Sequence, residues 1–271
     1  MRPRILIIND DGIQAPGIRH LYNSVKSFAD CMVVAPIAEK SGAALSMTLT
    51  KPLKLTPVKW EGAQNIWHVN GTPADCVKLA LNDLLTSPPD LIISGMNRGS
   101  NAGRNVLYSG TIGAVIEGVF RNNLPGIAFS CSDFDEPNYA AFEKYVFPII
   151  EHFLQHPLPE GSFVNVNFPS PAAGKIRGVR IARQGKGLWT DNPDKRLHPQ
   201  GEHYFWLGGT WKDCEEDPES DVHLLKEGYI TCVPIHINEL TNHELVDKHK
   251  PLFEDLFDHL TKEDLDFEEI P

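Results

Sequence analysis

Short apolar runs alternate with amphipathic stretches through the first half of the chain. Turn-forming residues bound four such runs, at residues 5–8, 32–35, 91–94 and 126–130. Uninterrupted apolar runs of this length are typical of strands buried on both faces of a parallel sheet. Apolar residues recur at helical spacing in three intervening stretches, residues 18–28, 77–85 and 112–120. This alternation predicts a doubly wound α/β domain.

The second of these helices carries a start signal of its own. In the stretch "NGTPAD", Thr72 suits the N-cap position and Pro73 suits the first helical position. Asp75 follows near the positive end of the helix dipole. We therefore expect a turn and then a helix from residue 73.

The second half of the chain has a different pattern. Partial alternation predicts further strands in three stretches, "FVNVNF", "IRGVRIAR" and "GYITCVP". Residues 185–227 are rich in Gly, Pro, aromatic and charged residues and are too long for an ordinary loop, so we expect a projecting hairpin arm or a binding flap. Beyond Pro251, apolar residues form one helical stripe: Leu252, Phe253, Leu256, Phe257 and Leu260. The apolar stripe of this helix needs a surface to pack against, either on its own domain or on another subunit.

Composition and charge narrow the classes of partner. The formal net charge is −11, which disfavours a nucleic-acid polymer or an anionic membrane surface as partner but leaves small anions open. Residues 252–271 alone hold eight acids and one lysine. The five cysteines are widely spaced and include no CxxC pair, which favours reduced thiols in a cytoplasmic protein. The sequence has neither an 18-residue apolar run nor a signal-peptide pattern.

Oxygen-bearing side chains follow several of the predicted strands. Asp10 and Asp11 end the first strand, Ser41 follows the second, and Asn97 ends the strand at residues 91–94. Ligands of open α/β sheets gather at this edge, and two neighbouring carboxylates there need a cation or several donors. Carboxylate, amide and hydroxyl oxygens suit Mg²⁺ or Mn²⁺. The alternative is that one aspartate only caps a helix while the other is solvated.

A second feature lies in the stretch "LYSGTIGAVIEG". Ser109, Gly110 and Thr111 precede a helix rich in small residues, so free backbone N–H groups and two hydroxyls would face a bound anion. The same residues also fit a plain N-cap with close helix packing. Taken together, a cation site and an anion-binding helix start are what the hydrolysis of a phosphate ester requires.

At this point the motifs resemble a known family. The chain looks like the SurE survival-protein family of metal-dependent nucleoside-monophosphate phosphatases. The matching stretches run in the family's order from residue 4 to about residue 234: "ILIINDDG", "VVAPIAEKSGAA", "VNGTPADCVKLAL", "DLIISGMNRGSNAG", "VLYSGTIGAVIEG", "FVNVNFP" and "ESDVHLLKEGYITCVP".

The resemblance assigns roles to the candidate residues. It implies one divalent cation per subunit, Mg²⁺ or Mn²⁺, held by four ligands: Asp10, Asp11, Ser41 and Asn97. It also implies phosphate contacts from Asn97 and from the segment Ser109, Gly110 and Thr111. Asp10, or otherwise Asp11, is expected to activate the attacking water.

The resemblance also implies an architecture. It predicts a Rossmann-like three-layer α/β/α core with a mainly parallel sheet over residues 1–184, and a projecting hairpin arm for oligomerisation over residues 185–227. Residues 228–271 would form a C-terminal strand and helix exchanged between subunits. The expected assembly is a homodimer or homotetramer.

The expected reaction is hydrolysis of nucleoside 5′- and 3′-monophosphates to nucleoside and phosphate, with short polyphosphate as a further substrate.

Other protein classes compete with this interpretation. A receiver-type regulatory module also binds Mg²⁺ at paired aspartates. Such a module needs a phospho-accepting Asp at a later strand end, where this chain has Ser94-Gly95 and Ser130-Cys131. A haloacid-dehalogenase-type phosphatase needs an Asp-x-Asp motif, which "DDG" is not. A non-catalytic nucleotide-binding protein remains the alternative.

The chain departs from the family pattern in the loop just before "VLYSG". Where the family usually has an acidic pair before "VLYSG", this chain has Arg104 and Asn105. The charge of the loop is therefore altered. An arginine at this position could add a phosphate contact.

Overall fold

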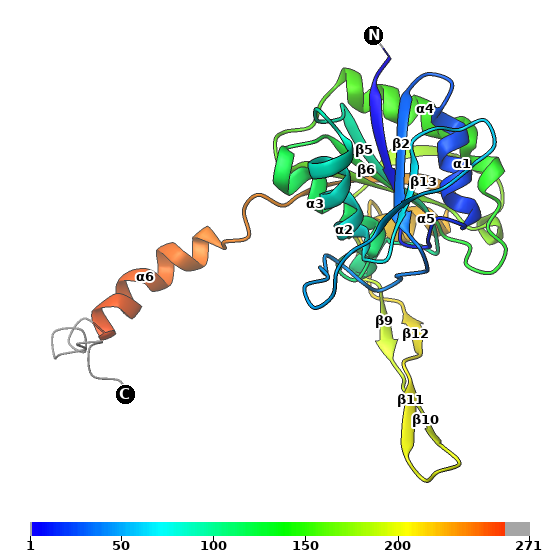
Figure 1. Ribbon diagram of the computed structural model, residues 1–271. Helices are drawn as coiled ribbons and strands as arrows, with labels where there is room; N and C mark the ends of the chain where they lie inside the picture. Colours follow the sequence, from blue (N-terminus) through cyan, green and yellow to red (C-terminus); the bar gives the residue numbers. More distant parts are fainter. Residues whose placement is uncertain (1, 258–271) are drawn as a thin grey trace, which may run out of the picture. The chain divides into compact units, whose positions relative to one another are not determined.

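The computed structural model describes residues 2–257, whose path is shown in Figure 1. The chain divides into two units, of which the first ends at His236 and the second begins at Ile237. All the predicted site residues lie in the first unit. None of the helices within residues 2–257 is long and apolar enough to cross a membrane.

Within residues 2–257 the main sheet has nine strands in the order β3-β4-β2-β1-β5-β6-β7-β13-β8. The strands at its centre are parallel: β4 (Ile66–Val69), β2 (Asp30–Pro36), β1 (Arg4–Ile8), β5 (Leu91–Arg98), β6 (Gly126–Cys131) and β7 (Ser162–Phe168). Strand β3 (Leu55–Pro57) and strand β13 (Tyr229–His236) pair antiparallel with β4 and β7, and β8 (Gly178–Ile181) runs parallel to β13. The four predicted apolar runs form β1, β2, β5 and β6.

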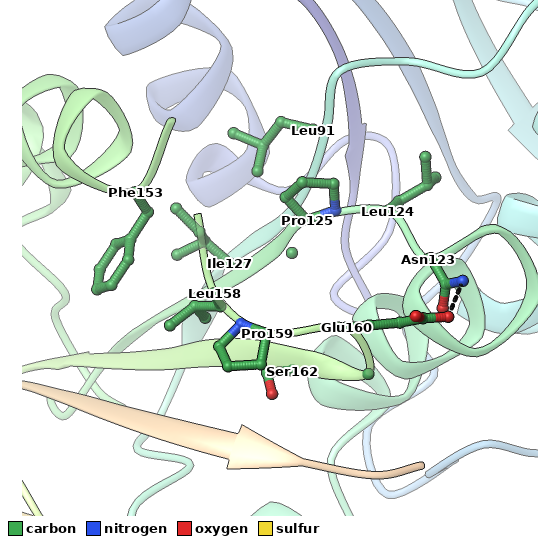
Figure 2. A pocket seen from close by; sticks show the side chains of 12 residues that line it. Leu91, Asn123, Leu124, Pro125, Ile127, Phe153, Leu158, Pro159, Glu160 and Ser162 are labelled. Atoms are coloured by element: carbon green, nitrogen blue, oxygen red, sulfur yellow. Dashed lines mark hydrogen bonds between the residues drawn. The ribbon is translucent and has the colours of Figure 1, made fainter. Parts of the chain in front are cut away.

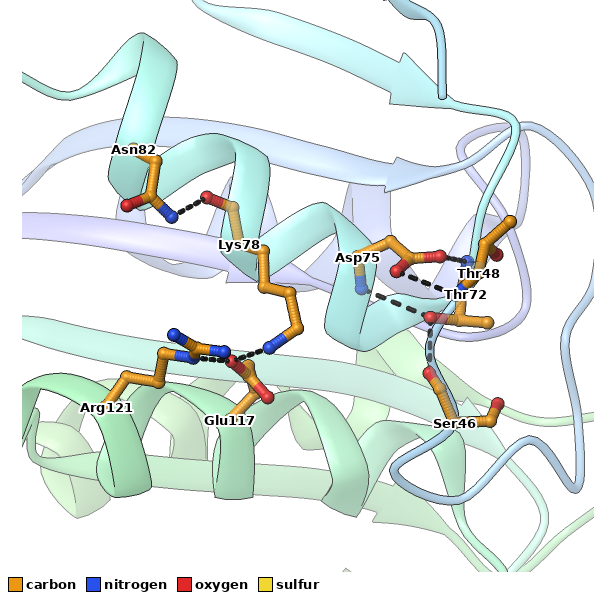
Figure 3. A network of polar contacts seen from close by, with 8 residues as sticks. All are labelled: Ser46, Thr48, Thr72, Asp75, Lys78, Asn82, Glu117 and Arg121. Carbon is orange, nitrogen blue, oxygen red and sulfur yellow. Dashed lines mark hydrogen bonds and ion pairs between the residues drawn. The ribbon is translucent and has the colours of Figure 1, made fainter. Parts of the chain in front are cut away.

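Helices cover both faces of this sheet (Figure 1). On one face α1 (Pro16–Val25) packs against α4 (Tyr139–Gln155), and the rings of Phe28 and Phe147 meet there at 4.6 Å. On the other face α2 (Pro73–Leu79), which continues into a π-helical turn over Ala80–Leu84, lies beside α3 (Gly110–Asn122), as Figure 3 shows. The predicted α/β architecture with a mainly parallel sheet is thus confirmed.

The start of α2 forms as its sequence predicts and also holds a neighbouring loop. Thr72 and Asp75 form a reciprocal capping box. The Asp75 carboxylate also accepts a hydrogen bond from the backbone N–H of Thr48, and the Thr72 hydroxyl donates to the backbone oxygen of Ser46 (Figure 3). One capping box therefore fixes the loop that follows β2.

A buried ion cluster joins α2 to α3. The Glu117 carboxylate is buried on α3, where Lys78 of α2 and Arg121 of α3 both donate to its Oε1 (Figure 3). A buried carboxylate is tolerated when cations and hydrogen bonds compensate its lost hydration. The cluster holds the two helices in register on this face of the sheet.

The predicted arm is a long hairpin built from two consecutive ladders (Figure 1). Strand β9 (Leu188–Asp191) pairs with β12 (Gly209–Lys212), and β10 (Asp194–Leu197) pairs with β11 (His203–Trp206). The chain then returns to the body through α5 (Asp221–Lys226) and β13. Because β13 pairs with β7 and β8, the boundary predicted after residue 227 falls inside the first unit.

The last helix begins earlier than its apolar stripe suggested. Helix α6 spans His243–Phe257 and contains Pro251, whereas the sequence placed the helix beyond that proline. Asn242 explains the earlier start, because its side-chain oxygen accepts from the N–H of Leu245 and its carbonyl accepts from Val246. Leu260, the last residue of the predicted stripe, and the acidic residues after position 257 lie outside the described residues.

Two hollows lie at the amino-terminal edge of the sheet, away from the predicted site. The smaller one, of about 40 Å³, lies where β5 and β6 begin, and Leu91, Pro125 and Phe153 are among its lining residues (Figure 2). The other, of about 530 Å³, is lined by residues at the starts of β1 and β2, including Arg4 and Asp30. Ligands of open α/β sheets bind at the carboxyl edge, so neither hollow is the predicted site.

Candidate active site at the carboxyl edge of the sheet

Adjacent strands bring the two aspartates and Asn97 to the same edge. Strands β1 and β5 are parallel neighbours, so Asp10 and Asp11 emerge beside the end of β5, where Asn97 and Arg98 lie. The backbone N–H of Arg98 donates to Oδ2 of Asp11 at 3.0 Å. This hydrogen bond joins residues 87 positions apart and fixes the two strand ends to each other.

Asp10 is the point at which three segments meet. Its side chain is only 2% exposed, and the Thr111 hydroxyl donates to its Oδ1. The backbone N–H of Lys40 donates to the Asp10 carbonyl at 2.7 Å, which brings Ser41 to the same edge. Gly110 lies so close that a Cβ there would be 2.8 Å from the Asp10 Cβ. The first strand, the loop after β2 and the start of α3 therefore form one site.

Burial makes the charged forms of both aspartates unfavourable. Desolvation raises the pKa of Asp10, although the Thr111 hydroxyl and the first-turn N–H groups of α3 oppose the shift. Desolvation and the neighbouring Asp10 charge raise the pKa of Asp11 from 3.8 to about 7. A bound cation would compensate the lost hydration and the mutual repulsion of these two carboxylates.

The remaining candidate ligands supply uncharged oxygens. The Asn97 amide nitrogen donates to the Gly99 carbonyl at 2.8 Å, and no described residue donates to its amide oxygen. Ser41 is exposed, and its hydroxyl donates to Glu39 at 2.7 Å. Two carboxylates, one amide oxygen and one hydroxyl form a hard donor set, which fits Mg²⁺ or Mn²⁺. No cluster of three or more His, Cys, Asp or Glu residues suited to a metal occurs within residues 2–257.

Ser109 takes the capping role that the sequence left open. Its hydroxyl oxygen accepts from the backbone N–H of Ile112 at 3.2 Å, and α3 begins at the next residue. Gly110 and Thr111 form the first turn of this helix and line Asp10. The helix start thus presents its positive end to the carboxylate edge, an arrangement that suits a bound anion.

Comparison with known proteins decides the family. Residues 5–191, which include every candidate ligand and phosphate contact, match the family described as "Survival protein SurE". The chain belongs to the SurE family. A protein of Protochlamydia amoebophila named "5'-nucleotidase SurE" is 49% identical over 255 residues, covering 93% of this chain and 97% of that protein. A protein of the same name from Pelotomaculum thermopropionicum is 40% identical, covering 92% and 95%.

A solved structure agrees with the sequence relatives. The crystal structure of the SurE protein from Aquifex aeolicus superposes with a TM-score of 0.79 at 33% identity. It covers 93% of this chain and all of the other. The resemblance inferred from the motifs is therefore confirmed for the family and for the fold.

The residues that depart from the family pattern lie at the base of the arm. Arg104 and Asn105 belong to a 3₁₀ turn over Gly103–Leu107. The backbone N–H of Arg104 donates to the Gly187 carbonyl at 2.9 Å, and its side chain is exposed. The Asn105 amide donates to the Ser100 carbonyl. A phosphate contact from Arg104 stays a prediction.

Sequence reasoning missed the buried carboxylate that supports this loop. Asp221 is fully buried at the start of α5, and its oxygens accept from the backbone N–H groups of Gly103, Gly185 and Val222. Burial raises its pKa, and these three donors oppose the shift. Asp221 therefore connects the loop after β5 with the base of the arm. The motif "ESDVHLL" contained the residue, but nothing in its spacing indicated these partners.

Asp221→Ala is expected to destabilise the chain by about 3 kcal/mol or more, because three buried N–H groups lose their acceptor. Chemical denaturation of the variant measures the effect, and Asp221→Asn, which keeps one oxygen, is expected to fall in between. An alanine variant as stable as the parent would show that water replaces the carboxylate without cost.

Proposed function

We propose that this SurE-family chain is a 5′-nucleotidase that hydrolyses nucleoside 5′-monophosphates and depends on a divalent cation. The observation that carries the proposal is the position of two adjacent aspartates at the carboxyl edge of β1, beside the start of α3, where the Thr111 hydroxyl donates to Asp10. Its curated relatives carry the name 5′-nucleotidase. From the family resemblance, we also propose hydrolysis of 3′-monophosphates and of short polyphosphate.

The residues that would hold the cation are Asp10, Asp11, Ser41 and Asn97. Bound there, a divalent cation would polarise a phosphoryl oxygen and lower the pKa of water. The chain supplies the positioning. Thr111 and the first turn of α3 hold the Asp10 carboxylate in one orientation, and the Arg98 N–H holds Asp11.

In the proposed reaction, Asp10 accepts the proton of the attacking water as the water oxygen bonds to phosphorus opposite the nucleoside oxygen. The P–O bond to the nucleoside breaks, and the leaving oxygen takes a proton from solvent. The positive end of α3 stabilises the negative charge on the phosphoryl oxygens. Asn97 and the N–H groups near Ser109 would orient the phosphate. The products are a nucleoside and inorganic phosphate.

Phosphate release from a panel of substrates tests the proposal. The panel contains nucleoside 5′-monophosphates, nucleoside 3′-monophosphates and tripolyphosphate, each with Mn²⁺, Mg²⁺ or EDTA. We expect release from the 5′-monophosphates with metal and none with EDTA. Nucleotide binding without phosphate release under any metal would favour the non-catalytic alternative.

The raised pKa of Asp11 predicts a pH effect on the metal-free chain. A carboxyl whose folded pKa of about 7 exceeds its unfolded value of 3.8 contributes stability that is present below pH 4 and is lost as the pH rises through 7. Relative to Asp11→Asn, the metal-free chain should therefore lose several degrees of Tm between pH 4 and pH 7.

Thermal melts of both chains with EDTA and with Mn²⁺ measure this effect. Mn²⁺ should stabilise the parent chain more at pH 7 than at pH 5, because the ligands must be deprotonated. Parallel Tm curves for the parent and Asp11→Asn across this range would contradict the assignment.

Self-association is proposed from the resemblance and supported by exposed apolar residues. The arm exposes Trp189, Phe205 and Trp206, and Leu252 of α6 is 69% exposed. Large apolar side chains exposed on a hairpin and on a helix favour contact with another chain. We expect sedimentation equilibrium to give the mass of two or four chains. The mass of a single chain at micromolar concentration would contradict this.

A further inference from the structure

Three side chains, at or just after the ends of β2, β5 and β6, meet next to Asp11. The Arg98 guanidinium carbon lies 4.5 Å from the centre of the Phe134 ring, within cation–π distance. In addition, Arg98 Nη2 lies 3.6 Å from Oε1 of Glu39. Because the backbone N–H of Arg98 donates to Asp11, this cluster borders the carboxylate site directly.

Phe134 is held in place, yet its ring remains available. It follows β6, the strand next to β5, and Arg98 is in register with Cys131. A Cβ added at Gly99 would be 3.4 Å from Phe134 Cδ2, so the ring lies close to the backbone after β5. Nevertheless Phe134 is 56% exposed. An aromatic side chain of this exposure, fixed beside a catalytic edge, offers a stacking surface.

The charge of the Phe134 loop indicates which part of a substrate it would contact. Asp133, Asp135 and Glu136 surround the ring in sequence, and the Asp133 carboxylate accepts from the N–H groups of the other two. Three carboxylates repel a phosphate but tolerate an uncharged heterocycle. In a nucleotide, the sugar separates the base from the phosphate, so a base-binding surface must lie at the border of the site.

We infer that the nucleobase stacks on the exposed face of Phe134, while Arg98 holds the ring in position. This inference rests on the proposed nucleotidase function and adds a residue that distinguishes nucleotides from simpler phosphate esters. Stacking on an aromatic ring is tolerant of base identity, because every base has a π-face. The preference should therefore be for nucleotides in general rather than for one base.

The test compares AMP with ribose 5-phosphate, which has the same ester and sugar but no base. Phe134→Ala should lower kcat/KM for AMP about tenfold, mainly through KM, and leave kcat/KM for ribose 5-phosphate unchanged. Phe134→Trp should retain the preference for AMP, and Phe134→Leu should lose it. Phe120→Ala is the matched control, because Phe120 is 67% exposed on α3 outside the cluster and its loss should change neither substrate.

Each outcome separates the inference from the proposed function. Equal losses for AMP and ribose 5-phosphate in Phe134→Ala would overturn the inference, since the ring would then only support the site. An unchanged ratio in Phe134→Leu would overturn it as well. Absence of phosphate release from both substrates in the parent chain would instead contradict the proposed function itself.

Discussion

Asp10→Asn is expected to lower kcat/KM for a nucleoside 5′-monophosphate by about 10³-fold. An amide cannot accept the proton of the attacking water, and it removes one negative charge from the proposed cation site. Its NH₂ group would also face donors, since the Thr111 hydroxyl donates to Oδ1 of the carboxylate. Steady-state phosphate release at saturating Mn²⁺ measures the loss.

The melting temperature of Asp10→Asn shows whether its loss of activity comes from misfolding. Burial raises the pKa of Asp10, so its charged form costs free energy in the metal-free chain near neutral pH. Asp10→Asn should therefore unfold at the same or a higher temperature than the parent in EDTA. Asp30→Asn is the control, because Asp30 is exposed at the opposite edge of the sheet. Activity of Asp10→Asn within threefold of the parent would contradict the assigned role.

Gly110→Ala is expected to lower kcat/KM about 10²-fold, although alanine is the better helix former. An alanine Cβ would be 2.8 Å from the Asp10 Cβ, 2.9 Å from its Oδ2 and 3.2 Å from the Lys40 carbonyl. Neither Asp10 nor the Lys40 backbone can move without displacing the carboxylate or the segment that carries Ser41. The substitution therefore acts on geometry without removing a functional group.

Gly118→Ala is the matched control for this substitution. It lies on the same helix, and its Cβ would be 2.9 Å from Cδ1 and 3.1 Å from Cγ2 of Ile92, which is fully buried. The substitution therefore crowds the core beneath α3 and not the carboxylate edge, so Tm should fall while activity stays within about twofold of the parent. Circular dichroism and melting temperature confirm the fold of both variants. Equal activities for the two alanine variants would show that the close contact at Gly110 is unimportant.

The centre of the fold could be predicted because its signals are local. The apolar runs of β1, β2, β5 and β6 and the capping box at Thr72 are written in consecutive residues. The pairing of β13 with β7 joins segments more than 60 residues apart, and the partial alternation that predicts each strand does not identify its partner. The sequence pattern placed the start of α6 too late, because its apolar stripe begins only after Pro251. The helix itself begins just after Asn242, whose side chain caps it.

The site was predictable to the extent that strand ends identify it. Asp10 and Asp11 follow the buried strand β1, and Asn97 lies near the end of β5, so their shared edge follows from parallel topology. The contact of Asp10 with Thr111 spans 101 residues, and Asp221 reaches Gly103 across 118. Contacts of this kind depend on how loops close over the sheet. The spacing of residues in the sequence did not indicate that Glu39, Arg98 and Phe134 form a cluster. It did not indicate the role of Asp221 either.

Anomalous diffraction from crystals grown with Mn²⁺ tests the central claim most directly. We propose that the carboxyl edge of β1 and β5 holds the divalent cation on which phosphate hydrolysis depends. We expect one anomalous peak per chain, within coordination distance of Asp10 and Asp11 and close to Ser41 and Asn97. A peak at another place, or no peak in crystals of a chain that hydrolyses AMP with Mn²⁺, would contradict the account.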